Sequence, residues 1–165
     1  MNQRFKRKKI IWCIFILYLI FMVWVLFGRN RFDVGKPYWE EVQLNINLLP
    51  FSTIKGYLHI LINNTNPHLV PHALLNLVGN IAAFIPLGFF VPYLFVCEKN
   101  FRCFLFHNVL LISSIELIQL FTLRGSCDID DLILNVSGSI IGFFIQCLVW
   151  RWLGYIADRR NNGRL

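Results

Sequence analysis

Four long apolar stretches constrain this chain more than any other feature of its sequence. They cover residues 10–27, 74–96, 104–123 and 132–152, and each is close to the ~20 apolar residues with which a helix crosses a bilayer. The last three contain one carboxylate between them, Glu116. Only 15% of the residues are charged, against ~25% in a typical soluble domain. We therefore predict an all-α, polytopic membrane protein with four transmembrane helices; a soluble bundle with an apolar core is the alternative.

The distribution of lysine and arginine predicts how these helices are oriented, because basic residues accumulate on the cytoplasmic side of a membrane. Of the 16 basic residues, eleven lie before the first stretch, between the second and third, or at the end of the chain: Arg4, Lys6, Arg7, Lys8, Lys9, Lys99, Arg102, Arg151, Arg159, Arg160 and Arg164. The other five lie on the opposite side: Arg29, Arg31, Lys36, Lys55 and Arg124. We expect both termini in the cytoplasm. Topology and anionic lipids then explain the net charge of +7, and nucleic acid is not expected as a partner.

The first stretch is predicted to remain as a membrane anchor. It is longer than the ~7–15 apolar residues of a signal peptide, and no small-x-small cleavage site follows it. The external segment that comes next, residues 28–73, contains a helical repeat of apolar residues at Phe51, Ile54, Leu58 and Leu61. Polar residues occupy the other side of this repeat. The pattern predicts a short amphipathic helix on the outer membrane surface; a helix packed against the external loops is the alternative.

Polar residues recur at the external end of three of the predicted spans. Asn76 and Asn80 are four residues apart in the second span, and Glu116 and Gln119 are three apart in the third, so each pair shares a helix face. Because the spans alternate in direction, all these residues converge on the outer half of the membrane. We predict a polar pocket there, formed by Asn76, Asn80, Glu116, Gln119, Arg124, Asp128, Asp130, Asp131 and Asn135.

Structural explanations exist for several of these residues. Asp128 is a suitable N-cap, and acidic residues in a first helical turn complement the helix dipole. The two asparagines of the second span could bond between helices, and Arg124 could extend down the same helix face to Glu116. A carboxylate at the depth of Glu116 is costly, however, and such residues usually face a cavity or a partner.

Proline and glycine predict how the helices pack. Pro86 removes a backbone donor inside the second span and should kink it. Gly88 allows close approach of another element, and Gly138 and Gly142 form a Gly-x-x-x-Gly pattern typical of close helix contacts. The five cysteines form no Cys-x-x-Cys pair, so neither a disulfide framework nor a metal site is predicted from them. No cofactor is expected.

Three stretches of the sequence resemble the VanZ-like family. They are NINLLPFSTI (45–54), NLVGNIAAFIPLGFFVP (76–92) and ELIQLFTLRGSCDIDDLILNVSG (116–138), to which Gly142 adds a further match. The resemblance covers residues 45–142 and implies one membrane domain over residues 1–165, in the bacterial cytoplasmic membrane. The family is named for a teicoplanin-resistance protein, so the resemblance implies a role in tolerance to such lipoglycopeptides.

Three kinds of function are compatible with this sequence. The first is a non-enzymatic protein that binds membrane lipids, a lipid-linked cell-wall precursor or a lipoglycopeptide at the outer leaflet. The second is a membrane enzyme in which Glu116 is a general base and Asp128, Asp130 and Asp131 collect a hard cation such as Mg²⁺. The third is a transporter, which four spans without an internal repeat could form only as a homo-oligomer.

Overall fold

The computed structural model describes residues 3–28, 36–63 and 67–162; Arg29, Arg31 and Arg164, which belong to the charge count above, lie outside these ranges. Four long helices dominate the described part: α1 (Gln3–Phe27), α4 (Val70–Leu94), α5 (Phe101–Phe121) and α6 (Ile129–Asn162). All four are long and apolar enough to cross a membrane, which confirms the predicted helical membrane class.

The helix boundaries differ from the predicted spans for local reasons. Helix α4 begins at Val70, earlier than position 74, and Pro71 in its first turn supplies a favourable backbone angle. Helix α5 begins at Phe101 because the side chain of Asn100 caps it by accepting a bond from the Arg102 N–H at 3.0 Å. Helix α6 continues to Asn162, beyond position 152, since no proline interrupts the basic tail.

Helices α4 and α6 approach each other so closely that only glycine fits at three positions. A Cβ atom at Gly138 would overlap the carbonyl oxygen of Ile81, and one at Gly142 would overlap that of Ile85. From the other side, a Cβ at Gly88 would meet the backbone of Ser139. Helix contact in a membrane depends on such small residues, because van der Waals packing replaces the hydrophobic effect there.

Apolar side chains fill the inside of the helix bundle and also cover its outside. Phe15 of α1, Phe84 of α4 and Ile112 of α5 are buried in one core cluster. In contrast, Leu17 and Trp24 of α1 are 66% and 70% exposed. Apolar exposure on this scale suits contact with lipid rather than with water.

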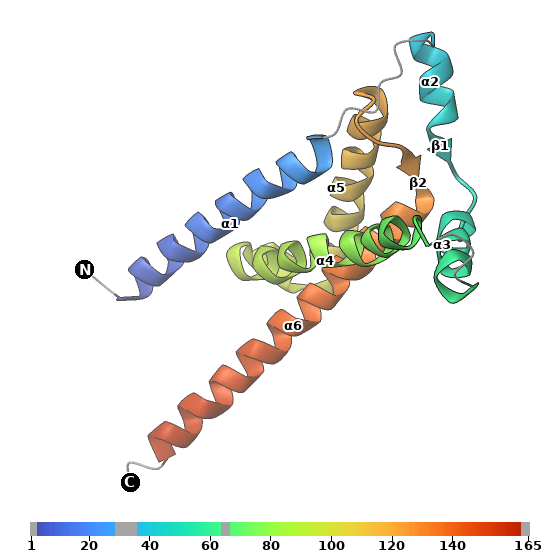
Figure 1. The fold of residues 1–165 in the computed structure, drawn as a ribbon. Coiled ribbons are helices and arrows are strands. Elements are labelled where there is room, and N and C mark those ends of the chain that lie inside the picture. Colours follow the sequence, from blue (N-terminus) through green and yellow to red (C-terminus); the bar gives the residue numbers. More distant parts are fainter. Residues whose placement is uncertain (1–2, 29–35, 64–66, 163–165) are drawn as a thin grey trace.

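A small structured unit, which we call the external unit, precedes α4. It contains α2 (Tyr38–Leu44), β1 (Ile46–Asn47) and α3 (Ser52–Asn63), and β1 pairs in parallel with β2 (Cys127–Asp128) just before α6. Helix α3 packs against α4. Figure 1 shows this unit at the end of the molecule remote from both chain termini. The sequence predicted α3 as a helix, whereas it gave no signal for α2 or for the strand pair.

Candidate functional site

A polar cavity of about 490 Å³ lies among the ends of α1, α4, α5 and α6 nearest the external unit. Its polar wall includes most of the residues that the sequence placed in a pocket, brought together from three helices and the loop after α5. They are Asn76, Asn80, Glu116, Gln119, Arg124, Asp131 and Asn135. Apolar residues complete the wall, among them Leu26, Leu75, Ala83 and Phe84.

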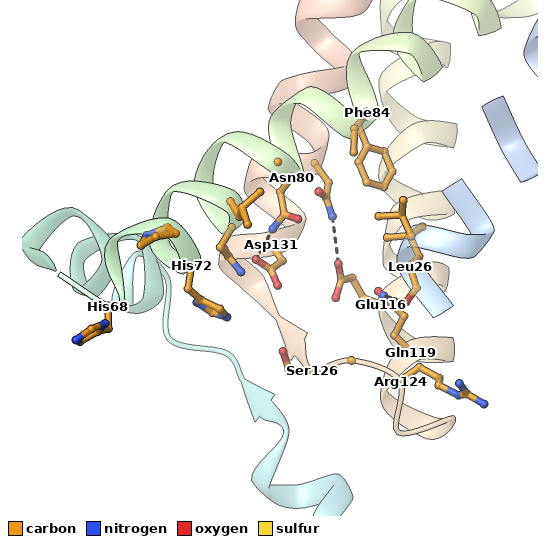
Figure 2. A pocket seen from close by; sticks show the side chains of 18 residues that line it. Leu26, His68, His72, Asn80, Phe84, Glu116, Gln119, Arg124, Ser126 and Asp131 are labelled. Carbon is orange, nitrogen blue, oxygen red and sulfur yellow. Dashed lines mark hydrogen bonds between the residues drawn. The ribbon is translucent and has the colours of Figure 1, made fainter. Parts of the chain in front are cut away.

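Two hydrogen bonds join the helices across this cavity (Figure 2). Asn80 of α4 donates to the Asp131 carboxylate of α6 at 2.7 Å. Asn135, one helical turn further along α6, donates to the Glu116 carboxylate of α5 at 3.2 Å. Glu116 is only 5% exposed, and among the described residues an amide, rather than a cation, binds its carboxyl group. The glutamate that the sequence singled out therefore faces a cavity and has an asparagine partner.

Two amide oxygens in the cavity wall are unsatisfied. The Oδ1 atoms of Asn76 and Asn135 are buried and accept no hydrogen bond from any residue within the described ranges. A buried acceptor without a donor costs roughly 1–3 kcal/mol, and native proteins rarely leave one in that state. The cavity therefore presents acceptors to a molecule with hydroxyl, amide or ammonium donors.

Gln119 and Arg124 connect the cavity to the end of α1. The Gln119 amide donates to the Leu26 carbonyl at 2.8 Å, and the Arg124 guanidinium donates to the Phe27 carbonyl at 3.2 Å. Cationic and amide donors suit the last carbonyls of a helix, which have no partner inside the helix. These two residues thus close one wall of the cavity by fixing α1.

The suggested contact between Arg124 and Glu116 is wrong. Helix α5 ends at Phe121, and Leu123 has a left-handed backbone (φ 53°), so the chain turns before Arg124 and leaves the helix face. In Figure 2 the Arg124 side chain extends away from Glu116. Burial of Leu123 against Val42 and Leu120 offsets the strain of this conformation, which a non-glycine residue rarely adopts.

Asp128 and Asp130 lie outside the cavity wall and bind the external unit instead. Asp130 is fully buried, and its carboxylate accepts backbone bonds from Phe51, Thr53 and Ile54 at 2.5, 2.8 and 3.0 Å. It therefore caps the N-terminus of α3 from another helix, a position where negative charge is favourable. We call this arrangement of Asp128, Asp130 and the backbone of residues 51–54 the α3 anchor.

Asp128 is both the second part of the α3 anchor and the N-cap of α6. One carboxylate oxygen accepts from the Asp130 N–H at 2.8 Å, as the sequence suggested for a cap. The other accepts from the Thr53 hydroxyl at 2.6 Å and from the Asn47 amide at 3.2 Å. The sequence placed Asp128 and Asp130 in the predicted pocket, whereas neither lines the polar cavity, and this prediction is corrected. The suggestion that Asp128, Asp130 and Asp131 together collect a hard cation is corrected as well, since the first two carboxylates face different partners from Asp131.

Two histidines that are not part of the predicted pocket line the cavity. They are His68 and His72, four residues apart with Pro71 between them. His68 lies in the turn that precedes α4, and His72 lies in the first turn of the helix, where proline is tolerated. The His72 ring also contacts Tyr57 of α3, with ring centroids 5.8 Å apart. Their proximity in the sequence to the polar residues of the second predicted span is the signal that could have pointed to them.

Comparison with known families found a match. The family model described as VanZ/LLP1 matches residues 15–151, which is most of the chain. The chain belongs to the VanZ/LLP1 family. The match extends beyond residues 45–142, on which the resemblance was based, and includes the second half of α1 and most of α6. No curated protein and no solved structure is similar enough to the chain to count as a match.

Within this VanZ-like protein, the residues that defined the resemblance separate into three groups. Asn76, Asn80, Glu116, Gln119, Arg124, Asp131 and Asn135 line the polar cavity. Asp128 and Asp130 form the α3 anchor. Gly88, Gly138 and Gly142 lie where α4 and α6 are closest, and Pro86 lies inside α4. The three groups have different physical roles although their residues alternate along the sequence.

Proposed function

We propose that this VanZ-like membrane protein binds the polar part of an amphiphilic ligand in the polar cavity, from the outer half of the membrane. The ligand classes that fit are a lipid-linked cell-wall precursor and a lipoglycopeptide of the teicoplanin type. Binding raises tolerance to such an antibiotic without a chemical reaction. The protein acts in the bacterial cytoplasmic membrane, with both termini in the cytoplasm.

The composition of the cavity wall is the observation that carries this proposal. Two carboxylates, Glu116 and Asp131, lie with four amide side chains and two unsatisfied amide oxygens beside an apolar wall. Hydroxyl, amide and ammonium groups of sugars and peptides are the natural donors to such acceptors. The apolar residues beside them suit the start of a lipid chain.

The position of the cavity in the fold supports binding from the outer leaflet. Four crossing helices bring both termini to the same side, and the bias of basic residues assigns that side to the cytoplasm. The polar cavity then lies near the outer surface together with the external unit. Phe51, Leu58 and Ile62 of this unit are 50%, 43% and 77% exposed, which suits an α3 that rests on lipid headgroups.

Expression in a sensitive bacterial host without a family member tests the proposal. We expect a several-fold rise in the minimal inhibitory concentration of teicoplanin and a smaller rise for vancomycin, because only teicoplanin carries an acyl tail. Equal rises for both antibiotics would argue against recognition of a lipid tail. No rise for either, with the protein present in the membrane, would remove the tolerance function.

A second candidate function is catalysis on a lipid-linked precursor, which the two cavity histidines favour. His68 and His72 lie in the same wall as Glu116, and imidazole and carboxylate groups are the usual general acids and bases. Incubation of purified protein with a lipid-linked precursor in vesicles separates the two candidates. A modified precursor would favour the enzyme, whereas recovery of unchanged precursor bound to the protein would favour the binding function.

A further inference from the structure

A second group of reactive side chains lies in the turn between α4 and α5, separate from the residues of the polar cavity. Glu98 belongs to the short 3-10 helix η1 (Val96–Lys99), and Cys103 and His107 are four residues apart on α5. This spacing places Cys103 and His107 on one face of the helix. Their metal-binding atoms and a carboxylate oxygen of Glu98 all lie within 4.8 Å of one another.

The distances in this group match those around a tetrahedral metal ion. The Cys103 Sγ and His107 Nδ1 atoms are 3.6 Å apart. Zinc bonds of ~2.3 Å to sulfur and ~2.0–2.1 Å to nitrogen at a tetrahedral angle place those two atoms about 3.6 Å apart. The Glu98 Oε1 and His107 Nδ1 atoms are 2.8 Å apart and hydrogen-bonded. An ion between them requires this distance to widen by roughly 0.5 Å.

The surroundings of Glu98 also favour a cation. Its second carboxylate oxygen, Oε2, is buried and forms no hydrogen bond with any residue in the described part of the chain. The carboxylate borders a largely apolar cavity of about 320 Å³ whose wall includes Leu87, Val91 and Phe104. A buried anionic oxygen beside apolar residues is costly unless a cation or a donor reaches it.

We propose that Glu98, Cys103 and His107 bind one divalent transition-metal ion, with Zn²⁺ as the best match. Thiolate, imidazole and carboxylate together are typical of zinc, whereas Mg²⁺ and Ca²⁺ prefer oxygen ligands alone. The His107 side chain is 53% exposed, so solvent can supply the fourth ligand. Binding requires the thiolate form of Cys103 and releases its proton to solvent.

The ion has a structural consequence for the turn. It links η1 to the second turn of α5 and fixes Glu98 at the edge of the apolar cavity. Because η1 and α5 hold the three ligands close together, the folded chain binds the metal more tightly than the unfolded chain, and the metal therefore stabilises the folded state. The site is independent of the proposed function, since none of its ligands lines the polar cavity.

Cobalt substitution of the full-length protein in detergent micelles tests the proposal. Protein treated with a chelator and then titrated with Co²⁺ should develop one thiolate-to-cobalt charge-transfer band in the near ultraviolet. Visible bands with the intensity of a tetrahedral site should appear at the same time and saturate at one ion per chain. Addition of Zn²⁺ should remove both, and Zn²⁺ should raise the thermal unfolding midpoint.

Variants identify the ligands and exclude other thiols. Cys103→Ser should abolish the charge-transfer band, and His107→Gln and Glu98→Gln should each weaken Co²⁺ binding at least tenfold. Cys147→Ser changes an exposed cysteine of α6 and should leave the spectrum unchanged. Retention of helical circular dichroism would show that the loss is one of binding. A band that survives Cys103→Ser, or no band in the wild-type protein, would overturn the proposal and leave Glu98 and His107 as a hydrogen-bonded pair.

Discussion

Two consecutive residues of α6, Asp130 and Asp131, belong to the α3 anchor and the polar cavity respectively, yet the polar groups of these two regions are satisfied in different ways. In the α3 anchor, Asp130 is fully buried and accepts three backbone N–H bonds from the chain that leads into α3. In the polar cavity, Asp131 faces Asn80, while nearby amide oxygens of Asn76 and Asn135 accept no bond among the described residues. The carboxylate of Asp130 in the α3 anchor is hydrogen-bonded within the protein, whereas the polar cavity contains acceptors that a ligand can bind.

This difference separates structural from ligand-binding roles for residues of the same type. A buried carboxylate whose bonds all go to the protein contributes to folding, and its loss leaves backbone donors unpaired. A carboxylate beside unsatisfied groups in a cavity can be changed with little effect on folding. The same chemical change, aspartate to asparagine, should therefore have opposite effects at two consecutive positions.

The largest expected effect is that of Asp130→Asn. The variant loses the charge and one of the acceptors at the start of α3, which costs about 3 kcal/mol or more. We expect much less protein in the membrane and a lower unfolding midpoint. Asp131→Asn is the matched control and should accumulate normally while it loses tolerance to teicoplanin. Quantitative immunoblots of membrane fractions measure the abundance of both variants. Normal abundance of Asp130→Asn would contradict the distinction between a structural anchor and a ligand-binding cavity.

A smaller loss of folded protein is expected for Gly138→Ala. Its new methyl group would overlap the Ile81 carbonyl oxygen and push α6 away from α4, at a typical overpacking cost of about 1–3 kcal/mol. Gly79→Ala is the control, because a Cβ there meets no atom within 4 Å. Thermal unfolding of both purified variants should show a lower midpoint for Gly138→Ala only. Equal midpoints would mean that α4 and α6 can separate without cost.

Glu116→Gln should have little effect on folding and a large effect on function. Glutamine keeps an oxygen that can accept from Asn135 but removes the ionisable carboxyl group from the cavity, so abundance should hold and teicoplanin tolerance should be lost. Because Arg124 binds the end of α1 instead, the stability effects of Glu116→Gln and Arg124→Gln should add. A fully tolerant, normally abundant Glu116→Gln strain would exclude a role for this carboxylate in the cavity.

Chemical labelling of Cys127 should not change stability. It reports on which side of the membrane the α3 anchor and the polar cavity lie. Burial raises the pKa of the Cys127 thiol above its ordinary value, and the carboxylates of Glu116 and Asp128 raise it further. The reactive thiolate is therefore scarce at neutral pH, and labelling should keep accelerating above the pH at which an exposed thiol reaches its maximum rate.

A membrane-impermeant methanethiosulfonate reagent applied to intact cells measures this reaction. On the proposed orientation, Cys127 should react slowly, a Lys36→Cys residue in the Cys127→Ser background should react fast, and Cys103 should not react. Reaction of Cys103 in place of the other two would reverse the topology and move the polar cavity to the cytoplasmic half.

The four membrane helices could be predicted from the sequence because a long apolar run is a local signal. Their packing through Gly138 and Gly142 also left a local pattern. The cavity residues of α4 and α5 could be found because helical spacing places Asn76 with Asn80 and Glu116 with Gln119.

The role of Asp130 could not be predicted in this way. Its partners lie 76–79 positions earlier in the chain, at and just before the start of α3, and no local pattern in the sequence links that helix to the start of α6. The direction of Arg124 depends on one left-handed residue, Leu123, and leucine gives no warning of such a turn. The position of Asp130 thus depends on contacts that are distant in sequence, and that of Arg124 depends on an unusual backbone angle.

The central claim is that the polar cavity holds a ligand, and Gly79→Leu tests it most directly. Gly79 lies in the cavity wall with open space where a side chain would begin, so leucine should project into the cavity, obstruct ligand binding and leave the helix contacts intact. Native mass spectrometry can compare wild-type and Gly79→Leu protein after each is mixed with a lipid extract of the host membrane. We predict a discrete lipid adduct on the wild-type protein that is absent from Gly79→Leu at equal folded content. Identical adducts on both proteins would contradict the claim.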